Sequence, residues 1–276
     1  MHFERAFRRS DRDGFSASDR NARNPLAVTG RLRDDSLAAV HWIELIDEPE
    51  PVVAPDRVLY STRPQKALGR DDFWYYLKGP DPAVVIAETL GYLLADRVGL
   101  PVPPFALCRH PGDGSLLFAS RAVSGRSGIP VLADRGRLTN PEVIGECFAF
   151  DLWTANPDRN DGNFVAKAQP GGRAQLFAID FESAKILRGV DRFTVAMMPA
   201  RDFLPRGDAA THCLAGAFPA PMCSAIAAVT PGTMHSIMND VGAAVGAAFS
   251  WQDAAADYLL RRAANVRTLV EEVWNA

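Results

Sequence analysis

The chain has 276 residues, of which 47% are apolar and 23% are charged, proportions close to those of an average soluble globular protein. Its 30 basic and 33 acidic residues give a formal charge of −3, which excludes the dense positive surface of a typical nucleic-acid-binding protein. The sequence has no signal-peptide core and no run of roughly 18 apolar residues that could span a bilayer. We therefore expect a cytoplasmic protein that binds neither a membrane nor, directly, nucleic acid. Four widely separated cysteines predict free buried thiols: Cys108, Cys147, Cys213 and Cys223.

The first part of the chain predicts a flexible segment, then strands, then one helix. Residues 1–38 are rich in Arg, Asp, Ser and Asn without a sustained period, so we expect them to be flexible. The runs VHWIELI, RVLYST and FWYYLK are typical of antiparallel strands. The helix that follows has Asp81 as N-cap, Pro82 at its first position and Gly99 as its stop.

The rest of the chain predicts two more strands, a hairpin and mainly helices. FALCRH and SLLFASRAV have the composition of strands, and Thr139 with Glu142 forms a capping box that predicts a helix to about Trp153. NFVAK and RAQLFAID flank a Pro-Gly-Gly turn, which predicts a hairpin, and a last helix runs to the C-terminus. The predicted fold class is α+β, with a strand-rich first part and a mainly helical second part.

A polar loop, NPDRNDGNFVAK at residues 156–167, leads into this hairpin. With the turn centred between Pro170 and Gly171, Asn163 faces residue 178, and Asp180 lies about two residues further on. An amide oxygen and a carboxylate then converge beside Asp158, and Mg²⁺ prefers such oxygen ligands. A separate carboxylate near the acceptor hydroxyl completes the requirements of phosphoryl transfer. The alternative interpretation of this loop is a hydrogen-bonded surface turn without a catalytic role.

Phosphoryl transfer from a nucleotide also needs a lysine for the phosphates and an acid that holds the lysine. Lys78 ends FWYYLK, and Glu88 lies ten residues later on an apolar helix face, where a carboxylate is costly unless it is paired. Ser61 and Thr62, in YSTRPQKALGRDD, are candidates for phosphate contacts, with an ordinary hairpin as the alternative. We expect three tryptophans to be core aromatics rather than an adenine clamp: Trp42, Trp74 and Trp153.

The segments YYLKGP...AETLGYLLADRVGLPVPP, NPDRNDGNF and FAIDFE, in this order and spacing, resemble the HipA-like kinases, a bacterial branch of the protein-kinase-like fold. The resemblance covers roughly residues 55–190. It implies that Lys78 contacts ATP phosphates and is braced by Glu88, that Asp158 is the catalytic aspartate, and that Asn163 and Asp180 hold Mg²⁺. Arg159, beside Asp158 in the catalytic loop, is expected to anchor that loop electrostatically. Asn160 stands where the family commonly has histidine, and DFE replaces the protein-kinase DFG.

The resemblance implies a bilobal protein-kinase-like fold, with residues 39–107 as the small lobe and 108–276 as the large one. The predicted function is ATP- and Mg²⁺-dependent phosphoryl transfer to a Ser or Thr of a protein, and the resemblance allows for a small antitoxin-like partner. Two alternatives stay open. IDFE also resembles the small-molecule aminoglycoside and choline kinases, although Asn156 replaces their usual histidine, and a nucleotide-binding pseudokinase would use the same cleft without turnover.

Overall fold

The computed structural model describes residues 40–52, 65–123, 125–127, 135–189, 195–196, 200–214, 216–246 and 251–275, and all structural statements below concern these residues. The predictions for residues 1–38, for the run RVLYST and for Ser61 and Thr62 fall outside them.

The first half of the chain forms a five-stranded antiparallel sheet. Its strand order is β1 (Glu50–Pro51), β2 (Gln65–Leu68), β3 (Trp74–Lys78), β5 (Leu116–Arg121) and β4 (Phe105–Arg109). Residues 41–45 pair with the sheet only through isolated bridges, such as Trp42 to Leu107. The prediction of a strand at VHWIELI, residues 40–46, is therefore wrong. The β4–β5 hairpin carries the sheet past residue 107, where the sequence placed the end of the small lobe.

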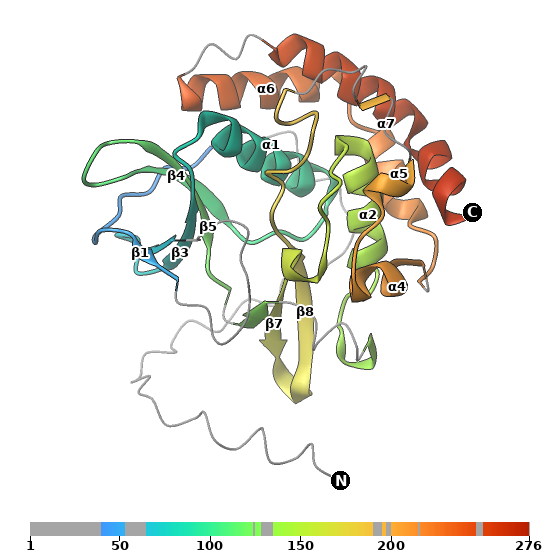
Figure 1. Ribbon diagram of the computed structural model, residues 1–276, viewed down its shortest axis with the longest axis horizontal. Helices are drawn as coiled ribbons and strands as arrows, with labels where there is room; N and C mark the ends of the chain where they lie inside the picture. The colour runs from blue at the N-terminus through green and yellow to red at the C-terminus, as the bar shows by residue number, and fades with distance from the viewer. Residues whose placement is uncertain are drawn as a thin grey trace. The chain divides into compact units, whose positions relative to one another are not determined.

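The helix α1 (Pro82–Val98) lies against one face of this sheet, as Figure 1 shows. Its predicted ends are confirmed: the Asp81 side chain accepts a hydrogen bond from the Ala83 amide at 2.9 Å, and Gly99 closes the helix with a φ of 82°. Tyr92 of α1 packs on Phe105 and Phe118 of the sheet, with ring centroids 5.3 and 4.8 Å away. The opposite face of the sheet covers a smaller core that includes Tyr75 and other apolar residues: Leu45, Ala67, Leu77, Cys108, Leu117 and Ala119.

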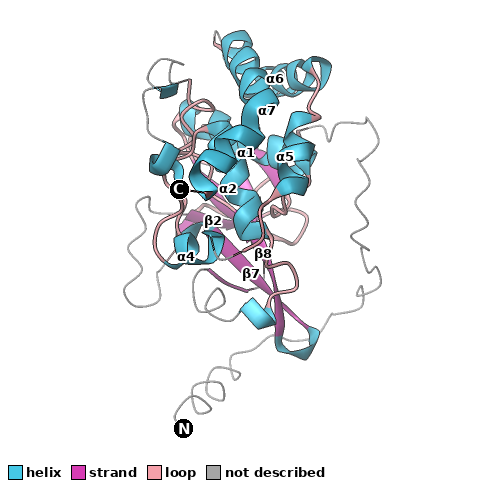
Figure 2. Cartoon of the chain, turned by 90° about the vertical axis from the view of Figure 1, so that its right-hand side faces the viewer, coloured by secondary structure: helices cyan, strands magenta, loops and turns pink. Residues whose placement is uncertain are grey.

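A second sheet contains β6 (Gly125–Ser127), β7 (Phe164–Gln169) and β8 (Arg173–Ala178), all antiparallel. Figures 1 and 2 both show the β7–β8 hairpin extending away from the helices. The hairpin is as predicted, but its register is one residue off. Its turn is a three-residue helical turn, Pro170–Gly172, in which Gly171 and Gly172 both have positive φ. Phe164 therefore pairs with Ala178, and Asn163 lies beside Ile179 instead of residue 178.

The remaining described chain is mainly helical, as predicted. The helices are α2 (Val143–Thr154), α4 (Asp208–Leu214), α5 (Ala220–Ala227), α6 (Pro231–Val245) and α7 (Gln252–Trp274). The largest core joins α1, α2, the hairpin and the later helices. None of the helices in the described ranges is long and apolar enough to cross a membrane.

Two further sequence predictions fail, one on helix capping and one on burial of tryptophans, and two predictions on burial are confirmed. Thr139 does not cap α2, because its amide and hydroxyl both bind the Ala174 carbonyl at the edge of β8. Trp153 is buried, but Trp42 and Trp74 remain 47% and 43% exposed, and the Trp74 ring stacks under the Lys66 ammonium instead of entering the core. All four cysteines are buried thiols outside any disulfide, as expected.

Candidate active site

The ammonium of Lys78, at the end of β3, lies among three carboxylates. Its Nζ is 2.6 Å from Glu88 Oε1, 2.7 Å from Asp180 Oδ1 and 3.1 Å from Glu182 Oε2. These three acids are called the carboxylate cluster below. They come from α1 and from the segment directly after β8, so the lysine joins elements far apart in sequence.

The segment Asp180–Glu182 is fixed by its central residue. The Phe181 side chain is fully buried between Tyr92 and Phe150, with ring centroids 5.4 and 5.3 Å away. It approaches α1 at Gly91 so closely that a β-carbon added to this glycine would stand 2.4 Å from Phe181 Cβ. Asp180 adopts a left-handed φ of 69°, which turns the chain so that Phe181 enters the core while its acidic neighbours face Lys78.

Glu88 binds this segment as well as the lysine. Its Oε1 accepts the backbone amides of Phe181 and Glu182, at 3.1 and 3.0 Å. Its other oxygen, Oε2, is buried and has no hydrogen-bond partner among the described residues. Glu88 therefore couples α1 to the segment that carries Asp180, and one of its oxygens stays unsatisfied.

The charged groups of this site shift one another's pKa values. Burial lowers the pKa of Lys78, but Glu88, Asp180 and Glu182 outweigh that effect and hold the pKa well above its usual value. Burial raises the pKa of Glu88 despite the attraction of Lys78. The three carboxylates thus hold Lys78 in its charged, ammonium form.

Most polar side chains of the loop at residues 156–163, called the polar loop below, stabilise the loop itself. Asn156 Oδ1 accepts the Asp158 amide at 3.2 Å, and Asn160 Oδ1 accepts the Gly162 amide at 2.9 Å. Asn163 Oδ1 accepts the Asn160 amide at 3.2 Å, which completes a capping box around the helical turn Asp161–Asn163. The asparagines therefore fix the conformation of the loop.

Arg159 anchors the polar loop from beneath. It is fully buried, and its Nε and Nη2 bind the two oxygens of Asp151 in α2, at 2.8 and 3.0 Å. Its Nη1 donates to the carbonyls of Asn163 and Ile179, the residue before Asp180. Arg159 thus ties together α2, the loop and the chain that leads to Asp180, which fits an anchoring role.

Asp158 differs from its neighbours in the loop. Its side chain is 45% exposed, and within the described part of the chain its carboxylate has one ion-pair contact, 3.9 Å from Arg206 Nη1. Residues 206–209, which carry Arg206, are hydrogen-bonded to the polar loop. The Arg206 amide donates to the Arg159 carbonyl at 2.7 Å, and the Asp161 side chain accepts the Ala209 amide. A carboxylate at this position is held in place by backbone contacts and presented to solvent.

The structure brings Lys78, Glu88 and Asp180 into direct contact. Asn163 lies next to Asp180 through the backbone bond from the Ile179 amide to the Asn163 carbonyl, at 3.0 Å, but no contact between the two side chains is observed in the described residues. Asp158 does not contact the Lys78 group. Sequence reasoning missed Asp151, whose signal is an acid in the second half of the apolar helix VIGECFAFDLWT, and Glu182, which it noted only as a departure from DFG.

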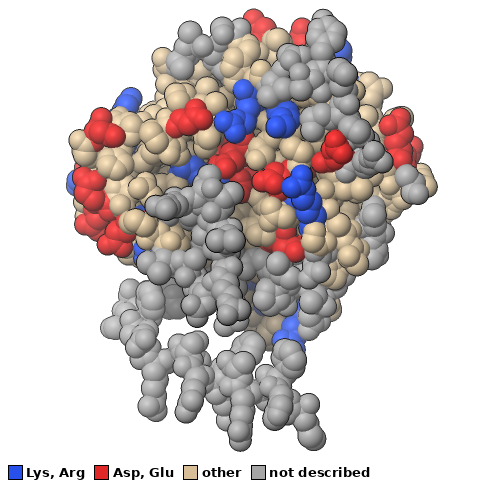
Figure 3. All heavy atoms as spheres, in the orientation of Figure 1, with Lys and Arg blue, Asp and Glu red and all other residues tan. Residues whose placement is uncertain are grey.

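The carboxylate cluster fits a divalent cation. One oxygen from each of Glu88, Asp180 and Glu182 lies within 4.8 Å of the other two. Mg²⁺ prefers oxygen ligands such as carboxylates, and Glu88 Oε2 is a buried oxygen without a hydrogen-bond partner among the described residues. On the face drawn in Figure 3, acidic and basic side chains of the described residues are interspersed.

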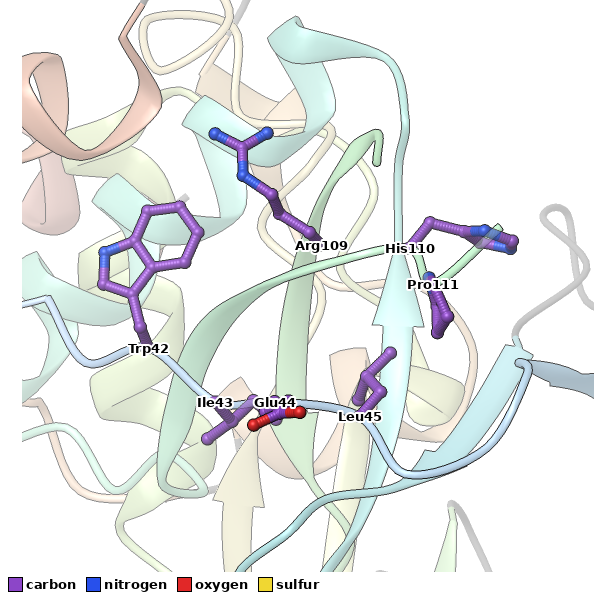
Figure 4. Close-up of a pocket in the computed structure, with 7 residues that line it drawn as sticks. All are labelled: Trp42, Ile43, Glu44, Leu45, Arg109, His110 and Pro111. Carbon is purple, nitrogen blue, oxygen red and sulfur yellow. The ribbon is translucent and has the colours of Figure 1, made fainter. Parts of the chain in front are cut away.

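A separate hollow of about 380 Å³ lies beside β4, as Figure 4 shows, and is lined by Trp42, Ile43, Glu44, Leu45, Arg109, His110 and Pro111. The Arg109 guanidinium lies 5.7 Å from the centroid of the Trp42 ring. Since none of the residues around Lys78 lines this hollow, we do not assign the chemistry of the site to it.

No protein-family model and no curated protein matches the chain. The chain is similar to the solved structure of the proinflammatory kinase CtkA of Helicobacter pylori, with 14% identity, a TM-score of 0.45, and coverage of 76% of this chain and 92% of that one. It is also similar to HipA in the Shewanella oneidensis MR-1 complex of HipA, HipB and operator DNA, with 14% identity, a TM-score of 0.44, and coverage of 83% and 68%. Both likenesses are distant, with TM-scores below 0.5, and neither carries a conclusion about function.

Proposed function

We propose that the chain is an ATP- and Mg²⁺-dependent phosphotransferase of the HipA-like kind, acting on a hydroxyl acceptor. The observation that carries the proposal is the position of Lys78, which contacts Glu88 from α1 and Asp180 from the end of the hairpin. An ammonium held by a buried acid and placed beside a metal-binding aspartate is the arrangement that nucleotide phosphates require. A structural ion pair alone would not call for a third and fourth charged group at the same point.

In this proposal each group has one task. Lys78 binds nucleotide phosphate oxygens, and Glu88 holds the lysine and orders the Phe181 and Glu182 amides. Asp180 is the chain's principal ligand for Mg²⁺, with Asn163 next to it, and the bound cation supplies neutralisation of phosphate charge. Arg159 holds the polar loop against Ile179 through the Asn163 and Ile179 carbonyls, and so fixes Asp158 relative to Asp180.

In this proposal Asp158 acts on the acceptor of the phosphoryl group. Its carboxylate orients the attacking hydroxyl and takes its proton as the oxygen bonds to the γ-phosphorus and the bond to the departing ADP oxygen breaks. Its exposure supports this task, because every other polar side chain of the loop discussed above is used in internal hydrogen bonds. In the same proposal the five-stranded sheet with α1 makes the small lobe and the later helices the large lobe of a bilobal kinase.

Incubation with ATP and Mg²⁺, followed by mass spectrometry of the protein, tests the proposal. We expect phosphate on a serine or threonine, and none when EDTA replaces Mg²⁺. Tight Mg-ATP binding with no transfer to the protein itself, to added proteins or to a panel of aminoglycosides and choline would contradict it and favour a pseudokinase. Transfer only to a small molecule would place the chain with the small-molecule kinases.

A further inference from the structure

Glu182 is the member of the carboxylate cluster to which the proposed function gives no task. Its Oε2 lies 3.1 Å from Lys78 Nζ, and its side chain is only 13% exposed. Asp180 and Glu182 are two residues apart, and because Phe181 between them is locked in the core, both acids face the same point. The packing of Phe181 therefore determines where Glu182 lies, and the Glu182 side chain is not a mobile surface group.

The charges at this point do not balance. Three carboxylates surround a single ammonium, which leaves a formal charge of −2 on four groups that are largely shielded from solvent. Uncompensated charge is costly in such surroundings. Lys78 satisfies one oxygen of each acid, and one divalent cation would supply the missing charge.

A second observation concerns Glu88, the fully buried member of the carboxylate cluster. Glu88 is fully buried, and its Oε2 has no hydrogen-bond partner in the described part of the chain, although buried carboxylate oxygens normally have one. Oε1 of the same side chain already accepts from Lys78 and two backbone amides. Glu88 is one of the three acids of the cluster, in which one oxygen of each acid lies within 4.8 Å of the other two.

We propose that Glu182 is a direct ligand of a divalent cation which it holds together with Asp180, and that this site binds the cation before any nucleotide arrives. The inference rests on the divalent cation of the proposed function and adds a ligand and an order of binding to it. Mg²⁺ is usually bound by one or two protein carboxylates, with water and substrate phosphates completing its coordination, so a site with a single carboxylate relies most on the phosphates. A site with a further acid at hand depends less on them. Binding of the cation draws Asp180 and Glu182 off Lys78 and leaves the ammonium, still braced by Glu88, available to a phosphate.

Glu182→Gln tests the proposal, because it removes the charge and keeps the shape. Mn²⁺ takes the same oxygen ligands as Mg²⁺, and the free ion can be counted by electron paramagnetic resonance in a titration without nucleotide. We expect the parent to bind one Mn²⁺ and Glu182→Gln to bind it at least tenfold more weakly, since even partners that only orient metal ligands are worth roughly 10–100-fold. Glu271→Gln, which alters an exposed acid paired with Arg267 on α7, is the matched control and should leave Mn²⁺ binding unchanged.

The opposing explanation is that Glu182 only competes with phosphate for Lys78. It predicts that Glu182→Gln binds Mn²⁺ like the parent and binds metal-free ATP more tightly, and that result would overturn the proposal. Failure of the parent to bind Mn²⁺ at millimolar concentration without nucleotide would overturn it too. Glu182→Asp, which keeps the charge but shortens the reach, should retain part of the Mn²⁺ affinity and guards against a folding defect in Glu182→Gln. Glu182-dependent Mn²⁺ binding in a protein that transfers no phosphate would refute the kinase function and leave this site standing.

Discussion

Arg159→Leu removes a fully buried guanidinium and leaves the Asp151 carboxylate inside the protein without its cation. The two bonds to Asp151, at 2.8 and 3.0 Å, disappear together with those to the Asn163 and Ile179 carbonyls. Breaking one side of a buried ion pair costs about 3–5 kcal/mol of unfolding free energy. For a chain of this size that corresponds to a loss of roughly 6–20 °C in melting temperature.

The control for Arg159→Leu is Arg267→Leu, which breaks the exposed pair with Glu271 on α7. An exposed pair is worth about 0–1 kcal/mol, so this variant should melt close to the parent. Both melting temperatures can be followed by circular dichroism. Equal small losses for the two variants would show that the Asp151–Arg159 pair does not anchor the polar loop.

The same pair predicts a pH dependence. Burial raises the pKa of Asp151, and Arg159 opposes this shift, so its removal raises the pKa further. A carboxyl whose folded-state pKa exceeds its unfolded value stabilises the fold at pH below those values and loses that contribution as pH rises through the folded pKa. The deficit of Arg159→Leu relative to the parent should therefore be smaller at pH 5 than at pH 8. A deficit that does not change with pH would refute an uncompensated Asp151.

Three further variants separate packing, metal binding and helix capping. Gly91→Ala should push Phe181 away from α1, cost about 1–3 kcal/mol in denaturant unfolding and weaken Mg-ATP binding, whereas Gly145→Ala in α2, whose nearest neighbour would lie 3.4 Å away, should be neutral or stabilising; equal effects would contradict the Phe181 contact. Asp180→Ala should greatly reduce Mg²⁺-dependent ATP affinity in calorimetry, and an unchanged affinity in a folded variant would remove Asp180 from the metal site. Asp81→Ala should lower the stability by about 1 kcal/mol without changing ATP affinity, which a shift in affinity would contradict.

The sequence predicted features that depend on neighbouring residues and missed those that depend on distant partners. Asp81 and Gly99 end α1 as expected, because capping is decided within one turn of helix. Thr139 and Glu142 have the same local pattern, but the edge of β8 takes the Thr139 hydrogen bonds, and no local pattern reports a tertiary acceptor. The hairpin register slipped by one residue because the number of residues in a Pro-Gly-Gly turn is not fixed by its composition.

In the candidate site, too, the sequence indicated what depends on neighbouring residues and missed what depends on distant partners. The contact of Lys78 with Glu88 followed from a charged residue on an apolar helix face, which needs a partner. Asp151 was missed because its pairing with Arg159 forms only when α2 and the loop pack together. Glu182 was visible in the sequence, two residues after Asp180, but only the burial of Phe181 turns both acids towards one point.

The central claim is that the polar loop presents Asp158 to an acceptor, and Asp158→Asn tests it most directly. The substitution is nearly isosteric and changes a side chain whose one described ion pair, with Arg206, is 3.9 Å long, so folding should be unaffected. We predict the parent's melting temperature and Mg-ATP affinity within a few-fold, with phosphoryl transfer reduced by about 10²-fold or more. Full transfer activity in Asp158→Asn would contradict the account and make residues 156–163 an ordinary surface turn.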